Sequence, residues 1–156
     1  MKRFTYWPQL FLGITFNYGL ILGWTSIKDQ IDIVPLLYYL GAIFWTLGYD
    51  TIYGYQDVKD DEIIGLKSTS IKFKGKAKKF LFICYSFIII LFIIGGYYMK
   101  FPNTYYLLII VPFLHLFFYQ IKIFNSKDPL SCLKAFKSNN IFGLIIFLNI
   151  LIIKSV

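Results

Sequence analysis

Acidic side chains gather in one short stretch, residues 49–70, with the sequence YDTIYGYQDVKDDEIIGLKSTS. Apolar sequence flanks this stretch on both sides. It holds five of the eight acidic residues of the chain, which are Asp50, Asp57, Asp60, Asp61 and Glu62. Carboxylates beside apolar helices are costly unless they face water, a metal ion or a charged ligand. The stretch is therefore the strongest candidate for a chemical site.

The spacing of these acids predicts a stripe along one helix, because residues three, four or seven apart share a helix face. The members of the expected stripe are Asp50, Tyr53, Asp57 and Asp61, with Asp60 beside it. Crowded carboxylates repel one another and need a cation to stay ionised. Hard oxygen ligands suit Mg²⁺, which is often held by one or two carboxylates together with substrate phosphates. A solvated acidic turn at a membrane surface is the alternative.

Basic and hydroxyl groups follow the carboxylates. Lys67, Ser68 and nearby backbone amides can meet phosphate oxygens, and this mixture suits the departure of a diphosphate, because a metal ion neutralises the leaving group. Three tyrosines, Tyr49, Tyr53 and Tyr55, could line a pocket whose ring faces stabilise an allylic cation. Aromatic side chains at this depth are also typical of an interface belt, which we favour for each tyrosine singly.

The rest of the sequence is dominated by apolar runs. Of the 156 residues, 58% are hydrophobic and 21% aromatic, with a mean hydropathy of +0.64. A soluble domain is closer to half apolar, so this composition indicates a membrane protein. The net charge is +8, but the charges stand in short segments between apolar runs, so topology explains them better than nucleic-acid binding. Cys84 and Cys132 are expected to be reduced and structural.

Five apolar stretches are long enough, or nearly so, to cross a membrane. They lie at about residues 7–24, 33–49, 80–99, 104–121 and 140–153, and the last is the shortest. Pro8 suits the opening turn of the first span. In the same span Gly19 and Gly23 form a G-x-x-x-G pair, which allows close approach of another helix. Pro112 predicts a kink in the fourth span.

Asn17 and His115 are polar residues inside predicted spans. Asn17 is expected to hydrogen-bond between helices, and the alternative is that it faces a substrate cavity. His115, the only histidine, is expected to be an interhelical donor rather than a ligand.

Basic residues predict the orientation, because the cytoplasmic side, or the matrix side in a mitochondrion, carries the excess of lysine and arginine. Two near the N-terminus, seven in residues 50–79 and four in residues 122–139 share one side, against three on the other. The N-terminus and the acidic stretch are therefore expected on the cytoplasmic or matrix side of a bacterial or mitochondrial inner membrane. The lysine-rich segment 72–79, KFKGKAKK, either contacts anionic lipid or is simply solvated.

The run YDTIYGYQDVKDDEIIGLKST resembles the second aspartate-rich motif of the UbiA prenyltransferases, and within them the 4-hydroxybenzoate polyprenyltransferases of ubiquinone synthesis. The opening KRFTYWPQLFLGITFNYGLILGW is similar to the fifth-helix region of that subgroup. The resemblance implies an all-α, multi-pass transmembrane bundle with a central cavity, of which residues 1–156 supply about five of nine helices. It also implies Mg²⁺-dependent transfer of a polyprenyl group from its diphosphate to an aromatic acid.

The resemblance also implies roles for single residues. The second motif of the family coordinates Mg²⁺ and diphosphate, and the ring carbon beside the phenol hydroxyl of the acceptor attacks the cation, so no side-chain nucleophile is needed. The predicted catalytic residues are Asp50, Asp57 and Asp61, and the predicted metal ligands are Asp57, Asp60 and Asp61. The residues expected to contact substrate are Arg3, Asn17, Tyr53, Lys67 and Ser68.

One feature departs from the family pattern. The family carries an early N-D-x-x-D motif, whereas no asparagine of this sequence is followed by aspartate. The chain is therefore expected to be the C-terminal half of a prenyltransferase, with little activity without an N-terminal half. A non-catalytic or remnant membrane scaffold is the alternative. A small cation carrier is a third hypothesis, disfavoured because the acids lie at a membrane edge rather than at mid-bilayer.

Overall fold

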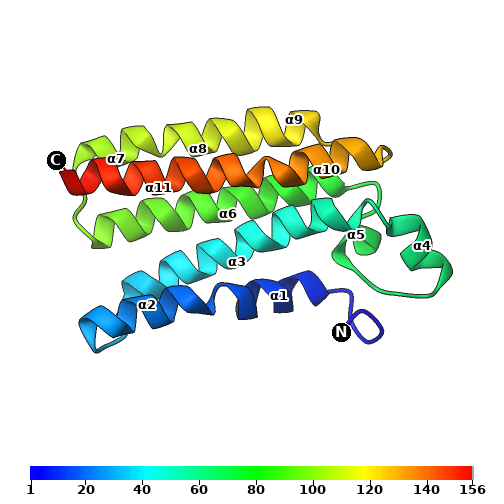
Figure 1. The fold of residues 1–156 in the computed structure, drawn as a ribbon, viewed down its shortest axis with the longest axis horizontal. Helices are drawn as coiled ribbons and strands as arrows, with labels where there is room; N and C mark the ends of the chain where they lie inside the picture. The colour runs from blue at the N-terminus through cyan, green and yellow to red at the C-terminus, as the bar shows by residue number, and fades with distance from the viewer. Residues whose placement is uncertain (156) are drawn as a thin grey trace.

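Five long helical rods lie side by side in the computed structural model, which describes residues 1–155 (Figure 1). Each rod is long and apolar enough to cross a membrane, and the described chain contains no strand. The rods cover residues 8–28, 33–54, 77–98, 103–123 and 129–154. The predicted all-α bundle with five spans is therefore confirmed.

Most rods are chains of shorter helices. The first joins α1 (Pro8–Phe16) to α2 (Tyr18–Lys28), the second is α3 (Ile33–Gly54) and the third is α6 (Ala77–Tyr98). The fourth consists of α7 (Asn103–Leu108), α8 (Ile110–Leu114), the π-helix η1 (His115–Gln120) and α9 (Ile121–Ile123). The fifth joins α10 (Pro129–Lys137) to α11 (Asn139–Ser155). Two short helices, α4 (Val58–Ile63) and α5 (Thr69–Lys72), lie between the second and third rods.

The ends of the fifth span differ most from expectation. The predicted span 140–153 is too short, because the rod begins at Pro129 within the stretch expected to be a polar loop. Asp128 starts this helix: its carboxylate accepts hydrogen bonds from the amides of Leu130 (3.1 Å) and Ser131 (3.3 Å). Pro129 then occupies the first helical turn, where its missing N–H is harmless.

Polar side chains join the rods at their interruptions. Asn17 separates α1 from α2, and its side-chain amide donates to the carbonyl of Gly13 and to the hydroxyl of Thr46 on α3, both at 2.8 Å. His115 Nε2 lies 3.1 Å from the carbonyl oxygen of Ser138 in the fifth rod. The interhelical roles predicted for Asn17 and His115 are thus confirmed, and a contact between Asn17 and substrate stays a prediction.

Pro112 has a similar consequence in the fourth rod. Proline has no N–H to bond the carbonyl four residues earlier, which here belongs to Leu108, the last residue of α7. Asn149 of α11 supplies the missing donor, and its amide lies 3.1 Å from that carbonyl. The hydrogen bond that Pro112 cannot make is therefore replaced by one from a neighbouring rod, next to the helix break at Ile109.

The core lies along α3, which contacts α1, α2, α5, α6 and α10. Gly48 makes room for a side chain of α6, because a Cβ atom there would lie 2.6 Å from the ring of the fully buried Tyr85. The G-x-x-x-G pair behaves differently, because a Cβ on Gly19 or Gly23 would meet nothing within 4 Å. No helix of the described chain uses the pair for close approach.

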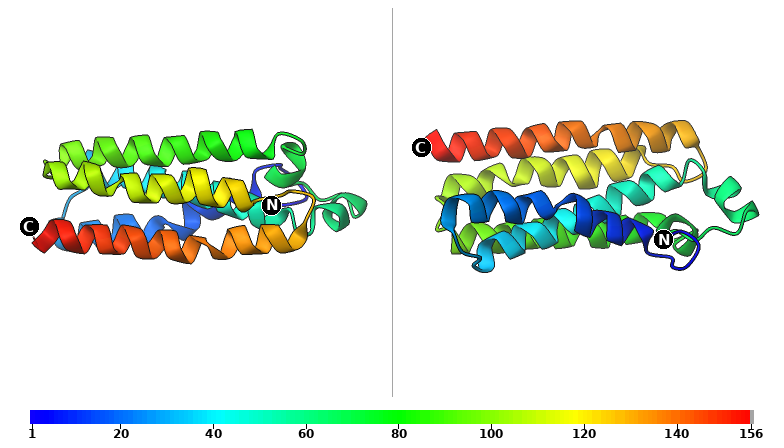
Figure 2. Two further views of the ribbon diagram at one scale, coloured as in Figure 1. Left: turned by 90° about the horizontal axis from the view of Figure 1, so that it is seen from above. Right: turned by 60° about the horizontal axis from the view of Figure 1, so that its bottom comes forward.

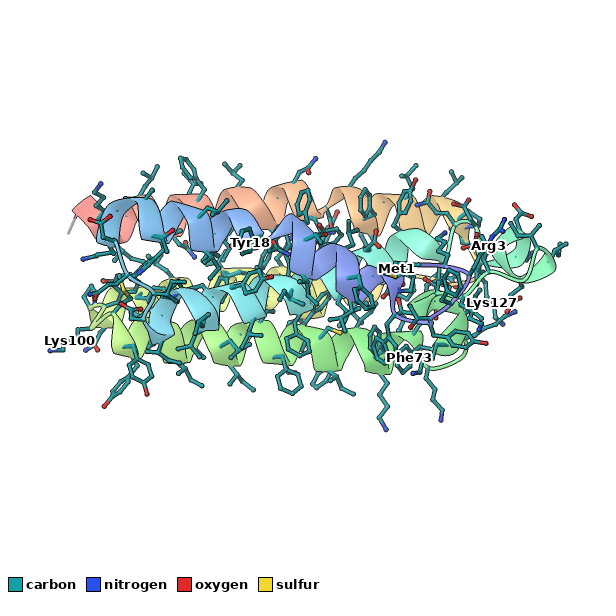
Figure 3. All side chains as sticks on the ribbon, turned by 90° about the horizontal axis from the view of Figure 1, so that it is seen from below. Met1, Arg3, Tyr18, Phe73, Lys100 and Lys127 are labelled. Carbon is teal, nitrogen blue, oxygen red and sulfur yellow. The ribbon has the colours of Figure 1, made fainter. Side chains whose placement is uncertain are left out.

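The two ends of the bundle carry different segments. Figures 1 and 2 show the N-terminus, α4, α5 and the start of α10 at one end, which we call the loop end, and the C-terminus at the other. Figure 3 places Met1, Arg3 and Lys127 at the loop end and Lys100 at the opposite end. The three basic segments predicted to share one side therefore do so, while the compartment that they face stays a prediction.

Candidate functional site

The acidic stretch is not one helix, so the predicted continuous stripe is wrong. α3 ends at Gly54, with Asp50 in its last turns, and α4 begins at Val58 with Asp57 at its N-cap. The chain turns between them because Tyr55 is drawn into the core. Its side chain is 3% exposed, and its ring lies 5.5 Å from that of Phe124.

Tyr55 also departs from the expected interface belt, because it is buried rather than placed at the surface. Its hydroxyl has no hydrogen-bond partner among the described residues. Burial raises the pKa of Tyr55 to about 12, so the hydroxyl is neutral at physiological pH. Tyr55 is therefore a core residue rather than part of a polar site.

α4 ends at Ile63, and Gly65 follows just after its C-cap residue, Ile64. Gly65 has a φ of +73°, a conformation that glycine adopts at little cost. Its N–H donates to the carbonyl of Glu62 (3.1 Å), and the N–H of Leu66 donates to the carbonyl of Asp61 (2.8 Å). This pair of bonds closes a helix at a left-handed residue. It turns the chain back toward the bundle.

Lys2 connects the N-terminus to the acids. Its ammonium forms an ion pair with Asp61 at 2.9 Å, and Asp61 is only 7% exposed. The carbonyl of Lys2 accepts a 2.6 Å hydrogen bond from the amide of Lys67. Lys2 thus links one predicted catalytic carboxylate, Asp61, to the basic tail of the motif.

Sequence reasoning missed Lys2 and named its neighbour Arg3, which is exposed at the loop end (Figure 3). Lys2 and Asp61 are 59 residues apart, so no helix spacing relates them. The one available signal was their shared membrane side, which applies equally to Arg3. A contact between Arg3 and substrate stays a prediction.

The remaining acids face outward. Asp57 and Asp60 are exposed, and Glu62 accepts a 2.8 Å bond from Lys74. No group of three or more histidine, cysteine, aspartate or glutamate side chains within residues 1–155 is placed to hold a metal ion. Magnesium is often bound by only one or two carboxylates plus substrate phosphates. The donors present fit that manner of binding, with phosphate oxygens completing the shell.

The hydroxyl groups after Lys67 face inward instead. Ser68, Thr69 and Ser70 have no exposed surface. The hydroxyl of Ser68 accepts from the amide of Ile71 at 3.2 Å and so caps α5. The amide of Thr69 donates to the side-chain oxygen of Gln9 in α1, at 3.1 Å. Ser68 therefore has a structural role here, and its predicted contact with substrate is not tested.

The same segment is bound to the end of α3. Thr51 donates its hydroxyl hydrogen to the carbonyl of Leu47 at 2.6 Å, so the hydroxyl of Thr69, also at 2.6 Å, is the donor to Thr51. Ser70 donates to the carbonyl of Thr51 at 2.8 Å. Gly54 makes room for this contact, because a Cβ there would lie 2.4 Å from the Ser70 oxygen.

Lys67 remains open to a ligand. It is half-buried, its ammonium lies 5.7 Å from the ring centroid of Tyr6, and it forms no ion pair within the described chain. A cation over an aromatic face keeps its charge available for a second partner. The predicted phosphate contact of Lys67 is therefore compatible with its surroundings.

Trp45, Tyr49 and Tyr53 form a row of aromatic side chains along one face of α3, and the row ends beside the acidic residues. Tyr53 and Tyr49 both lie against Phe136 of α10, with centroid distances of 4.8 and 5.8 Å. The indole N–H of Trp45 donates to Asn139 Oδ1 at 2.9 Å, where α10 and α11 meet. Tyr53 is 43% exposed, so its ring remains accessible beside the acids.

Residues 1–150 match the UbiA prenyltransferase family. The chain therefore belongs to this family, whose fold is a multi-pass membrane bundle and whose members generally use a divalent metal cation. The family model covers both the aromatic face of α3 and the whole acidic stretch.

Several curated proteins named "4-hydroxybenzoate polyprenyltransferase, mitochondrial" are similar to the chain. The protein of Bos taurus is 43% identical over 97% of this chain and 41% of its own length. The protein of Homo sapiens is 40% identical over 97% of this chain and 41% of its own length. The protein of Dictyostelium discoideum is 40% identical over 99% of this chain and 33% of its own length. The chain thus spans about two fifths or less of these relatives. No solved structure matches it.

Proposed function

We propose that this chain is the C-terminal half of an integral-membrane 4-hydroxybenzoate polyprenyltransferase of ubiquinone synthesis. The transfer moves a polyprenyl group from its diphosphate to the aromatic acid. The observation that carries the proposal is the arrangement at the loop end, where Lys2 pairs with Asp61 while Asp57 and Asp60 stay exposed. The names of the relatives support the choice of acceptor.

The metal in this proposal is Mg²⁺, held by Asp57 and Asp61 with Asp60 as a further ligand. When bound, it supplies positive charge that balances the diphosphate leaving group. Lys67 adds a second positive charge toward the phosphates, and Lys2 compensates the buried charge of Asp61. The hydroxyl segment, Ser68 to Ser70, holds the end of α3 in register with this charge cluster.

The organic part of the reaction falls to aromatic and apolar surfaces. The exposed ring of Tyr53 offers its π face to an allylic cation formed near the acids. An apolar cavity of about 450 Å³, lined by Tyr38, Phe92 and Tyr105 among others, is a candidate for the prenyl chain. Along α3, Tyr38 lies about 18 Å from Asp50, so the chain would extend along the bundle axis.

An N-terminal half as partner follows from the unequal burial of the rods. The most apolar window of α3 and that of α6 are each 44% buried, but that of the first rod is 11% buried and that of the fifth 22%. Lipid covers part of such faces, and we assign the rest to the N-terminal helices of the complete domain. The greater length of the relatives supports this assignment.

The proposed location is an inner membrane, mitochondrial or bacterial, with the loop end on the matrix or cytoplasmic side. Most of the lysine and arginine residues lie at that end, as the positive-inside rule requires. The relatives are named as mitochondrial proteins, which favours the mitochondrial inner membrane.

The test is a complementation assay. The chain is co-expressed with the N-terminal portion of a matched relative, and membranes are assayed for prenylated 4-hydroxybenzoate with and without Mg²⁺. We expect product only with both halves and the metal. Asp57→Asn should lower kcat/KM by about 100-fold or more. Asp29→Asn, at the opposite end, is the control, because asparagine tolerates the left-handed backbone there (φ 55°).

Unchanged turnover in folded Asp57→Asn protein would contradict the assignment of the site. Absence of diphosphate binding in the complemented, folded complex would favour a non-catalytic scaffold instead.

A further inference from the structure

A second pocket, of about 540 Å³, opens at the loop end. Residues 75–79, at the start of α6, form one wall, and residues 124–127, between α9 and α10, form the other. The lining contains no aspartate or glutamate. It contains four lysines, Lys76, Lys78, Lys79 and Lys127, so we call it the lysine pocket.

The charges of the lysine pocket are not balanced within the described chain. The two ion pairs there, Lys2–Asp61 and Lys74–Glu62, involve none of its lysines. The adjacent carboxylate of Asp128 already accepts two amide hydrogen bonds as the cap of α10. Several like charges around one pocket repel one another, and a bound anion removes that cost.

The backbone adds further donors to the same pocket. α6 begins at Ala77 without a side-chain cap, and its first three amides lie in the wall. Such amides have no partner within the helix, and the helix dipole makes this end positive. Ser126 lines the same space from the second wall.

The second wall is held in place by Asn125. Its side-chain oxygen accepts from the amide of Lys127 at 3.1 Å, and its carbonyl accepts from Asp128 at 3.0 Å. Phe124, 1% exposed, and Ala77, 5% exposed, close the floor against the bundle. The lysine pocket is thus an open groove with a buried floor, and its four lysines are exposed around it.

Its position decides the kind of anion. The third span begins at Ala77 and the fourth ends at Ile123, so the pocket lies where two membrane rods reach the lipid headgroups. Basic pockets between transmembrane helices on the positive side bind phosphate headgroups. We propose that the lysine pocket binds the headgroup phosphate of an anionic phospholipid in the leaflet at the loop end. This proposal does not depend on the transfer reaction.

The test measures lipid retained by the purified full chain in detergent, using native mass spectrometry with phosphatidylglycerol or phosphatidylcholine. The pocket variant combines Lys76→Gln, Lys78→Gln and Lys127→Gln. The matched control combines Lys122→Gln, Lys134→Gln and Lys137→Gln, which are exposed, outside the lining and equal in charge change. We expect the pocket variant to lose phosphatidylglycerol affinity by about tenfold or more, and the control by about twofold or less.

A single change in the exposed loop, Lys127→Glu, provides a second test with little risk to folding, and should weaken phosphatidylglycerol binding in the same direction. Equal losses in both triple variants would overturn the proposal, because diffuse attraction would then suffice. Equal retention of both lipids would also overturn it. A third arm uses inorganic diphosphate, and pocket-dependent binding of diphosphate without phosphatidylglycerol would assign the pocket to a soluble phosphate instead.

Discussion

Two neighbouring segments of the motif use polar side chains in opposite ways. In the acidic segment, residues 50–62, three carboxylates are exposed (Asp57, Asp60 and Glu62) and Asp61 is ion-paired with Lys2. In the hydroxyl segment, residues 67–70, three consecutive side chains have no exposed surface and bond to protein groups. Residue types alone predict that both segments bind a ligand. Their partners show that the first is open to a ligand, whereas the second builds the support.

The difference has an energetic basis. A buried polar group that loses its partner costs about 1–3 kcal/mol, so the hydroxyl segment is stable only with its internal bonds intact. Exposed carboxylates keep their water and can exchange it for a metal ion at small cost. Substitutions in the acidic segment should therefore change activity more than stability, and those in the hydroxyl segment should do the reverse.

The largest effect is expected for Asp61→Asn, together with Asp57→Asn, in the complemented enzyme. Removing the Asp61 carboxylate should lower kcat/KM by about 100-fold, because it takes away a ligand of the proposed Mg²⁺, whose charge balances the leaving group. Glu62→Gln is the matched control: it is the next residue, but its partner is the exposed Lys74. Similar losses in the two variants would show that the loop needs net negative charge rather than a particular carboxylate.

The next largest effect is expected for Lys2→Met, which should lower kcat/KM by about tenfold, because residues that orient metal ligands typically contribute this much. The concentration of Mg²⁺ needed for half-maximal activity should rise as well, since Asp61 loses its partner. Lys2→Arg should restore most activity by keeping the charge, and Lys59→Met, exposed on α4, is the control. An unchanged metal requirement would remove Lys2 from the site.

Gly54→Ala tests the contact between the two segments. The new methyl group would lie 2.4 Å from the oxygen of Ser70, so unfolding in detergent should become easier by about 1–3 kcal/mol. Gly19→Ala, where a Cβ meets nothing within 4 Å, should be neutral or slightly stabilising. Thermal midpoints followed by circular dichroism compare the two variants. Equal midpoints would mean that the hydroxyl segment can shift to accommodate the new methyl group without a loss of stability.

Ser68→Ala should have the smallest effect. Loss of the cap on α5 is expected to cost about 1 kcal/mol in the same thermal assay, with kcat/KM changed by less than about threefold. A loss of activity comparable to that of Asp61→Asn would break the comparison, because it would give Ser68 the substrate contact that the sequence predicts.

The sequence by itself determined the class of protein, the number of spans and the shared side of the basic segments. Each depends on a local property, either the length of an apolar run or the position of charges between runs. The family motif could be recognised for the same reason: its acidic residues and the GLKST run lie within one short stretch of sequence.

Only the tertiary structure decided which polar groups are free. The pairing of Lys2 with Asp61, the support of Thr69 by Gln9 and the burial of Tyr55 join residues of different elements. No periodicity links such positions, since their distance depends on how the rods and connections pack. The break between Asp50 and Asp57 has the same origin, because burial of Tyr55 in the core outweighs the helical spacing of the acids around it.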